Sequence, residues 1–269
     1  MKERLDIYLQ LKMSVKSRTK AQALIKGGFV TVNGTPVTKP GFFVSDGDDV
    51  QIVQNDLLKY VSRGGLKLEK ALKEFGIDLE GAVVLDIGSS TGGFTDCALQ
   101  HGADKVIAVD VGTDIMDAAL RKNPKVELHE NTDIRDFDIE KYERLDYCVC
   151  DASFISLTVA LKGLGKSSRA FKLITLIKPQ FECGPITASR CKGVISDKSV
   201  HREVLQKVLG SLKQMGFIPE KLTFSPVKGG DGNIEYLALF DHNLENVDTG
   251  AVFNILNIVE EAFSLDLHN

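Results

Sequence analysis

The stretch from Val84 to Leu99, VLDIGSSTGGFTDCAL, does most to limit what this chain can fold into. It reads as a buried strand ending near Asp86, a glycine-rich turn and the start of a helix. Four more apolar segments follow, KVIAVDVG, VELHENTD, LDYCVCDAS and FKLITLIKP. Helical patterns lie between most of these segments. This alternation predicts an α/β fold with a mostly parallel central sheet. The late segments IPEKLTFSPV and NIEYLALF are predicted to pair antiparallel, so that the last strand runs against the sheet.

The N-terminal segment differs in charge from the rest of the chain. The net charge over 269 residues is -4, yet the first 40 residues hold eight Lys or Arg and only two acids. This asymmetry indicates a basic module on an acidic body. Two helical patterns come first, and an Asn33-Gly34 hairpin signal joins two short strands. We therefore predict a small α+β domain over residues 1–55, a linker over 56–62 and the α/β domain over 63–269.

This basic module resembles the S4 RNA-binding domain. The resemblance rests on RLDIYL, KSRTKAQALIKGGFVTVNG and GDDVQI, and it implies a helix pair and a small sheet that dock on structured RNA. Basic side chains of the second helix and its approach can reach phosphates. Solvated surface charges are the alternative. The residues expected to contact RNA are Arg4, Lys16, Arg18, Lys20, Lys26 and Arg63.

The glycine loop selects among nucleotide-like ligands. It lacks the lysine of a Walker A loop, which disfavours a nucleoside triphosphate, and Ser90 stands where a dinucleotide fingerprint needs its second glycine. What remains is a strand with Asp86, then Gly88, then a glycine pair that opens a helix. That shape suits S-adenosylmethionine, which has no pyrophosphate and needs only close approach of the backbone.

Acids at successive strand ends support this cofactor. Asp86 can contact its amine, Asp110 its ribose hydroxyls and Asp133 its adenine amino group, since the strand ends meet at one edge of the sheet. Each acid alone is more often a strand-end cap. The residues predicted to bind the cofactor are Asp86, Gly88, Ser89, Ser90, Thr91, Gly92, Gly93, Phe94, Asp110, Asp133 and Asp151.

Five motifs in order, SRGGLKLEKAL, LDIGSSTGGFTDCAL, CDASFISL, LIKPQFE and GGDGNIEYL, resemble the TlyA-type family of S4-linked ribosomal RNA methyltransferases. The resemblance implies a Rossmann-like domain of the FtsJ/RrmJ type. It also implies methyl transfer from S-adenosylmethionine to the ribose 2′-oxygen of cytidine in 16S and, in some members, 23S ribosomal RNA. The matching catalytic set is Lys67, Asp151, Lys178 and Glu235. Early members of the family were called hemolysins.

The residues themselves are consistent with these roles. Asp151 and Lys178 each follow a predicted strand, so both face the ligand edge. A ribose hydroxyl is a poor nucleophile, and Lys178 is assigned as its general base or as the cation that stabilises the alkoxide. Lys67 positions the ribose and tunes the charge, while Asp151 and Glu235 orient the two lysines. Two ordinary salt bridges are the alternative reading.

The remaining features narrow the context. Of the five cysteines, Cys148 and Cys150 read as buried strand residues, and neither a metal site nor a disulfide framework is expected. No segment is long and apolar enough for a membrane span, so we expect a cytoplasmic protein with ribosomal RNA or ribosomal subunits as partner. A monomer and a weak dimer both remain open. The segment CGPITASRCKGVISD reads as a loop. A non-catalytic ribosome-assembly factor and a hemolysin are the competing functions.

Overall fold

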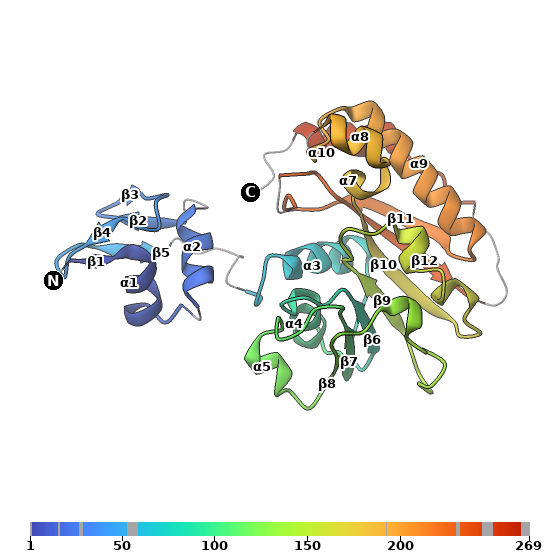
Figure 1. Ribbon diagram of the computed structural model, residues 1–269, viewed down its shortest axis with the longest axis horizontal. Coiled ribbons are helices and arrows are strands. Elements are labelled where there is room, and N and C mark those ends of the chain that lie inside the picture. Colours follow the sequence, from blue (N-terminus) through green and yellow to red (C-terminus); the bar gives the residue numbers. More distant parts are fainter. Residues whose placement is uncertain are drawn as a thin grey trace. The chain divides into compact units, whose positions relative to one another are not determined.

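The computed structural model describes residues 2–15, 17–26, 29–52, 59–191, 193–229, 232–243 and 250–264. Its contacts divide the chain into two compact units, Met1–Ser62 and Arg63–Asn269, and Figure 1 shows the elements of each. Residues 56–58 of the predicted linker lie outside the described residues. No helix of the described residues is long and apolar enough to cross a bilayer.

The N-terminal unit contains the predicted helix pair and hairpin. Asn33 and Gly34 both have positive φ, 51° and 75°, as a two-residue hairpin turn requires. The structure adds one short antiparallel pair that the sequence pattern did not predict, β1 with β4. The other strands form an antiparallel sheet in the order β3-β2-β5. The elements are β1 (Glu3–Arg4), α1 (Leu5–Lys12), α2 (Arg18–Lys26), β2 (Val30–Val32), β3 (Thr35–Pro36), β4 (Phe43–Val44) and β5 (Val50–Ile52).

The second unit is built on a seven-stranded sheet in the order β11-β12-β10-β9-β6-β7-β8. Its neighbours pair in parallel except β12, which runs antiparallel to both β10 and β11. The predicted α/β class and the reversed last strand are therefore confirmed. The strands are β6 (Val83–Ile87), β7 (Lys105–Val109), β8 (Val126–His129), β9 (Tyr147–Cys150), β10 (Phe171–Ile177), β11 (Ile218–Phe224) and β12 (Tyr236–His242).

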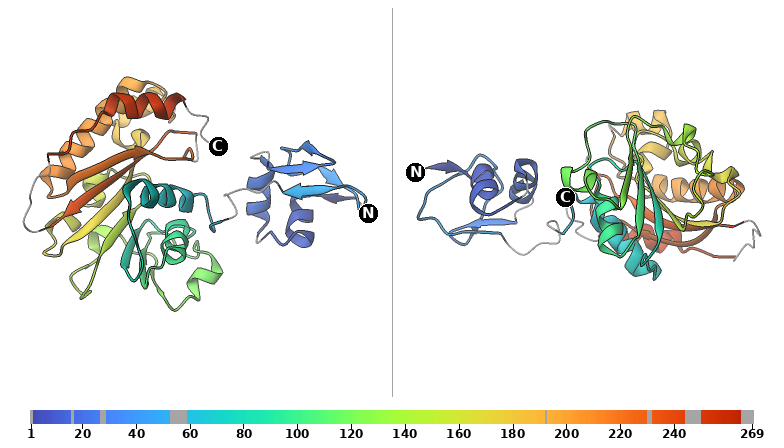
Figure 2. Two further views of the ribbon diagram at one scale, coloured as in Figure 1. Left: turned by 180° about the vertical axis from the view of Figure 1, so that it is seen from behind. Right: turned by 90° about the horizontal axis from the view of Figure 1, so that it is seen from below.

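Helices cover both faces of this sheet (Figures 1 and 2). On one face α4 packs on β6, β7 and α3, and on the other α9 packs on α6, α7 and α10. The helices are α3 (Gly64–Phe75), α4 (Gly93–Gln100), α5 (Ala118–Arg121), α6 (Leu157–Ala160), α7 (Pro179–Glu182), α8 (Pro185–Arg190), α9 (Lys198–Gln214) and α10 (Ile255–Ser264). Two short 3₁₀ turns, η2 (Ile134–Asp136) and η3 (Leu164–Lys166), complete the described elements.

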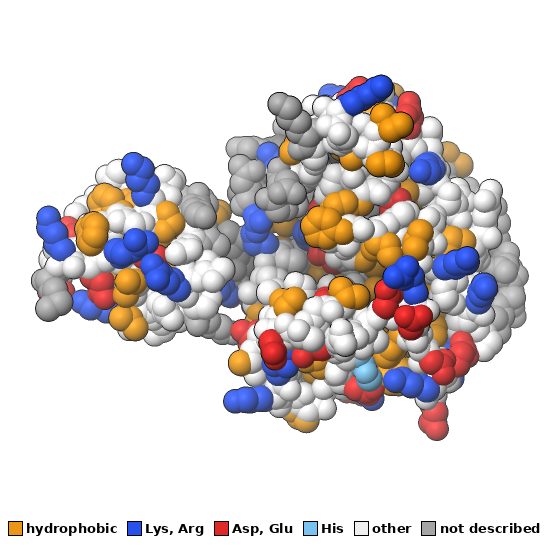
Figure 3. Space-filling model, viewed as in Figure 1, with side chains coloured by type: hydrophobic (Ala, Val, Ile, Leu, Met, Phe, Trp, Pro, Cys, Tyr) orange, Lys and Arg blue, Asp and Glu red, His pale blue; other side chains and the backbone are white. Residues whose placement is uncertain are grey.

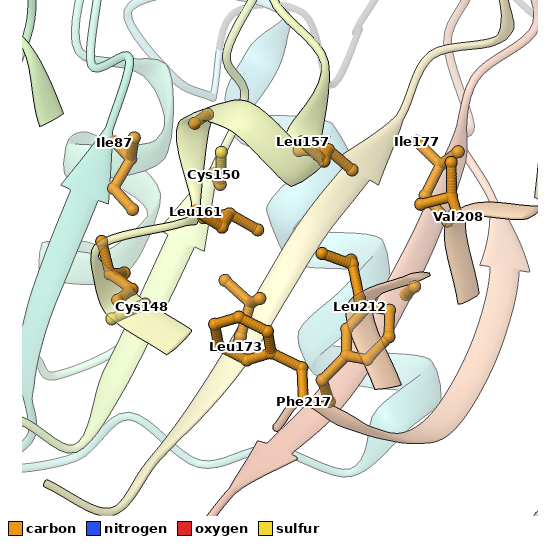
Figure 4. Close-up of a cluster of buried hydrophobic side chains, with 14 of the residues drawn as sticks. Ile87, Cys148, Cys150, Leu157, Leu161, Leu173, Ile177, Val208, Leu212 and Phe217 are labelled. Carbon is orange, nitrogen blue, oxygen red and sulfur yellow. The ribbon is translucent and has the colours of Figure 1, made fainter. Parts of the chain in front are cut away.

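The main core lies between the sheet and α6 and α9. Cys148 and Cys150 of β9 point into it beside Leu161, as predicted for buried strand residues (Figure 4). From α9, Val208 and Leu212 enter the same cluster four residues apart, one helical turn from each other. Each such aliphatic side chain contributes about 1.5–3 kcal/mol when it is fully buried. This packing fixes β9 and β10, whose carboxyl ends carry the candidate catalytic residues.

Two local expectations were wrong. The segment from Cys183 to Asp197, read as a loop, contains the helix α8, which begins at Pro185, a residue suited to the first helical position. The third parallel strand, β8, ends at His129, four residues before Asp133. Asp133 instead caps η2 by accepting a hydrogen bond from the Arg135 amide. Aspartate favours such turns. The pairing of β8 with its neighbour ends at His129, before Asp133.

Candidate active site

Two glycines allow the loop after β6 to pass close to its neighbours. Gly88 has φ 76°, and a Cβ there would lie 3.2 Å from the Cα of Ala152. Gly92, which precedes α4, has φ 92°, and a Cβ there would lie 2.3 Å from Cδ1 of Leu120. A side chain at either position would meet both backbone strain and a steric clash. The sequence therefore brings bare backbone to the carboxyl end of β6.

A pocket of about 450 Å³ lies at the carboxyl ends of β6, β7 and β9. Its size falls within the range of small-ligand sites, and its place is where open α/β sheets bind their ligands. Five of the residues predicted to bind the cofactor line it: Gly88, Ser90, Asp110, Asp133 and Asp151. Two others, Ser89 and Phe94, are buried in the body of the unit, at 4% and 3% exposed.

Asp110 is held in place by the loop that it faces. Its two carboxylate oxygens accept hydrogen bonds from the Ser90 and Gly112 amides, each at 2.7 Å. A carboxylate has about four acceptor positions, so lone pairs remain for a diol in the pocket. Asp133 is also in the pocket wall, and its hydrogen bond from Arg135 lowers its pKa. Both side chains therefore present carboxylate oxygens to the pocket.

Asp86 differs from these two acids because it is fully buried. One oxygen, Oδ2, accepts a 2.6 Å hydrogen bond from the Thr95 hydroxyl of α4. The other, Oδ1, is buried and has no hydrogen-bond partner among the described residues. Burial, with the nearby Asp151 and Asp110 charges, outweighs the Thr95 bond and raises the pKa of Asp86 to about 7. A buried oxygen without a hydrogen bond destabilises the folded state, and a cationic amine of a ligand would supply the missing donor.

We expect the raised pKa of Asp86 to make the cofactor-free protein less stable above about pH 7 than at about pH 4. The folded pKa is about 7 against 3.8 for a free aspartate, so the folded state holds the proton more tightly. Its contribution to the unfolding free energy is complete below about pH 4 and is lost as the pH rises through about 7, a fall of about 2–4 kcal/mol. Urea denaturation at several pH values measures it.

The Asp86→Asn variant should lack this decline, because it has no proton to lose. Asp136→Asn, a change at an exposed acid in the same unit, should keep the decline of the wild type. Identical pH dependence in the wild type and Asp86→Asn would show that Asp86 is ionised throughout the range.

The structure brings all four predicted catalytic residues together beside the pocket. Lys67 Nζ lies 2.6 Å from Glu235 Oε2 and 3.6 Å from Asp151 Oδ2, and Lys178 Nζ lies 2.6 Å from Asp151 Oδ1. Lys67 comes from α3, Asp151 and Lys178 follow β9 and β10, and Glu235 precedes the reversed strand β12. The result is a chain of alternating charge, Glu235–Lys67–Asp151–Lys178, that is largely shielded from solvent.

The charge state of Lys67 follows from its surroundings. Burial alone would lower the pKa of its ammonium, but the Asp151 and Glu235 carboxylates more than compensate, and the net pKa is raised. Lys67 is therefore a permanent cation between two acids. Its predicted roles, to position the ribose and to tune the charge, remain predictions.

The Lys178 ammonium faces three oxygen atoms. Its Nζ forms an ion pair with Asp151 Oδ1 at 2.6 Å, and it donates hydrogen bonds to Ser153 Oγ at 2.8 Å and to the carbonyl oxygen of Asp151 at 3.2 Å. These contacts hold the side chain of Lys178 beside Asp151. Pro179 follows and begins α7, which fixes the chain direction at Lys178. The ammonium therefore lies at the pocket edge, next to Asp151 in the pocket wall.

Three residues of the site were not predicted from the sequence. Ser153 bonds Lys178, and the side-chain amide of Gln180 donates to Glu235 Oε1 at 3.4 Å. Phe154 lines the pocket with 91% of its surface exposed and with φ 63°, an outlier for a bulky side chain. Its ring lies 5.1 Å from that of Phe181. The only sequence signal was their closeness to Asp151 and Lys178 in CDASFISL and LIKPQFE.

The predicted RNA-contacting residues fall into three groups. Arg4 and Arg18 both bond Asp6, and Lys20 Nζ donates to the Tyr60 carbonyl at 2.8 Å. Arg63 is the residue before α3 in the second unit. Lys16 and the side chain of Lys26 lie outside the described residues.

A doubly wound sheet with a strand-end pocket and a buried lysine–carboxylate cluster defines a Rossmann-like group-transfer enzyme. The model of the FtsJ-like methyltransferases matches residues 60–242, and that of the S4 domain matches residues 3–50. The chain therefore belongs to the FtsJ-like methyltransferase family and carries an S4 domain ahead of the enzyme unit, as the sequence motifs predicted.

Relatives of known name support this assignment. Hemolysin A of Brachyspira hyodysenteriae is 43% identical, with 88% of this chain and 99% of that protein covered. The 16S/23S rRNA (cytidine-2′-O)-methyltransferase TlyA of Mycobacterium tuberculosis is 37% identical, with 87% of each covered. A solved structure from Streptococcus thermophilus is 36% identical and has a TM-score of 0.74, with 98% of this chain and 96% of that one covered.

Proposed function

We propose that this enzyme transfers a methyl group from S-adenosylmethionine to the 2′-oxygen of a cytidine ribose in ribosomal RNA, in the cytoplasm. The observation that carries the proposal is the buried Glu235–Lys67–Asp151–Lys178 chain beside the strand-end pocket. The relative named as a cytidine-2′-O-methyltransferase supports the substrate class. The S4 domain of this chain supports RNA as the partner.

The pocket residues fit this cofactor. The unpartnered Oδ1 of Asp86 would accept from its amine, the backbone at Gly88 would run along it, and Asp110 would bind its ribose hydroxyls. When bound, the cofactor supplies an electrophilic methyl group on a cationic sulfur. Closing the pocket around that methyl aligns acceptor, carbon and leaving group, which is itself a large part of catalysis.

The acceptor side is provided by Lys178 and its neighbours. A ribose hydroxyl that enters beside Asp151 meets the Lys178 ammonium, which stabilises the negative charge that develops on the oxygen. If Lys178 first loses its proton, it takes the hydroxyl proton instead. Lys67 is held by ion pairs with Glu235 and Asp151 and remains a cation during this step. The exposed ring of Phe154 offers a stacking surface to the base.

Mapping of the product tests the proposal. The enzyme, S-adenosylmethionine and purified 30S and 50S subunits are incubated, and the added methyl is located by nucleoside mass spectrometry. We expect 2′-O-methylcytidine in one or both subunits, and none with the Lys178→Ala variant. A methyl group on a base would contradict the proposal, because the lysine cluster acts on a hydroxyl. Lysis of erythrocytes by this variant would favour the hemolysin alternative.

Asp110 offers a separate test of the cofactor. We expect Asp110→Ala to weaken S-adenosylmethionine binding by about 1–3 kcal/mol, the range for groups left unpaired. Isothermal titration calorimetry measures the affinity, and Asp136→Ala, an exposed change, is the control. An unchanged affinity in a folded Asp110→Ala protein would remove Asp110 from the site.

A further inference from the structure

Asp6 of the N-terminal unit is a buried carboxylate on which three side chains converge. Its side chain is 0% exposed. Arg4 donates to it through Nε at 3.0 Å and Nη2 at 3.1 Å, and Arg18 through Nε at 2.9 Å. Gln22 adds a fourth bond at 2.9 Å. The hydrogen bonds from Arg4, joined by those from Gln22 and Arg18, hold the pKa of Asp6 well below its usual range. The carboxylate is thus ionised at any physiological pH.

The two arginines are only partly used by this contact. Their side chains are 41% and 50% exposed. A guanidinium has five N–H donors in a planar fork, so the edges turned away from Asp6 keep donors for another anion. Two positive charges surround one negative charge, which leaves the cluster positive. Figure 3 shows Lys and Arg side chains grouped on the visible face of this unit.

We propose that Asp6 is the positioning residue of a phosphate-binding site formed by Arg4 and Arg18, which holds the RNA backbone. The proposal rests on the proposed function, since that function makes RNA the partner. Free arginine side chains lose much rotamer freedom when they bind, and a carboxylate that already fixes them removes part of that cost. Guanidiniums bind phosphate oxygens with the same planar, paired geometry that they use for carboxylates.

The Asp6→Asn variant separates positioning from charge, because the two predict opposite signs. Removal of a negative charge should by itself tighten binding to a polyanion. Loss of the positioning contact should weaken it, by about tenfold for one well-placed charge-assisted hydrogen bond. Binding of the full chain to purified 30S and 50S subunits, measured by filter retention, gives the answer. We expect weaker binding by Asp6→Asn, and unchanged or tighter binding by the control Asp49→Asn, an exposed acid of the same unit.

A second comparison excludes simple unfolding of the unit. In a chain that carries Arg4→Ala and Arg18→Ala, the further change Asp6→Asn should no longer weaken binding, and the salt dependence of log affinity should already be shallower by about one per arginine. A loss that persists in this background would overturn the proposal, as would Asp6→Asn binding as tightly as the wild type. This experiment measures binding and not methyl transfer. Its result therefore stays valid even if the methyl group is transferred to an atom other than the ribose 2′-oxygen. A wild type that binds neither subunit overturns both proposals.

Discussion

We expect the Lys178→Ala variant to lose methyl transfer by at least about 10²–10⁴-fold, the contribution of a positioned acid–base group, while its fold and its cofactor affinity stay close to those of the wild type. Lys178 contacts Asp151 and Ser153 at the edge of the pocket, where the acceptor oxygen would enter. Lys178 is not among the residues that line the pocket, so we expect its removal to act mainly on the chemical step. Single-turnover transfer to ribosomal subunits, with calorimetry of cofactor binding alongside, measures both quantities.

The Lys178→Arg variant then separates the two roles left open for this lysine. Arginine keeps the positive charge but stays protonated, so it cannot accept a proton. The Asp151 carboxylate that pairs with Nζ favours the role of a stabilising cation. If Lys178 is a base, the wild-type rate rises with pH and Lys178→Arg is inactive at every pH. An arginine variant with substantial activity would contradict the base role, and an active Lys178→Ala would contradict both roles.

The second large effect concerns stability. We expect Lys67→Met to lower the free energy of unfolding by about 3–5 kcal/mol, because it leaves a buried carboxylate without its cation. The Glu235 side chain is 3% exposed and lies 2.6 Å from Lys67 Nζ. Denaturant unfolding of the full chain measures the change. Lys73→Met, at an exposed position on the same helix α3, should change it by less than about 0.5 kcal/mol.

A compensating change shows whether the loss comes from the unpaired charge. The double variant Lys67→Met/Glu235→Gln should recover most of the stability, since both charges are gone, yet it should not regain methyl transfer. Equal stability of the single and double variants would mean that Glu235 is not the group left uncompensated. Recovery of activity would mean that the Lys67 charge has no part in catalysis.

The fold could be predicted from local patterns because each strand and each glycine turn leaves its own signal. The wrong expectation at Asp133 shows the limit: pairing with β7, not the local apolar run, decides that β8 ends at His129. The four candidate catalytic positions were predicted from motifs, but their geometry could not be. Lys67 and Glu235 are 168 residues apart, and only the packed sheet brings them together.

Burial is the other quantity that the sequence could not provide. The pattern placed Asp86 at the end of a strand and predicted a contact with the amine of the cofactor. The structure leaves one of its oxygens unpartnered inside the protein, which raises the pKa of Asp86 to about 7. Likewise Asp6 was counted only as one of two acids among basic residues, whereas its side chain is fully buried and paired with two arginines. The burial of Asp6 and the raised pKa of Asp86 both depend on residues that are distant in the sequence.

The reversed strand β12 also has a consequence for synthesis of the chain. The described wall of the strand-end pocket is built from residues 87–160, whereas the charge chain joins Lys67 of α3 to Glu235, which precedes β12. A nascent polypeptide that stops before residue 235 would contain the whole pocket wall and lack the last member of the charge chain. The charge chain is therefore complete only once β12 has been made and has paired with β10.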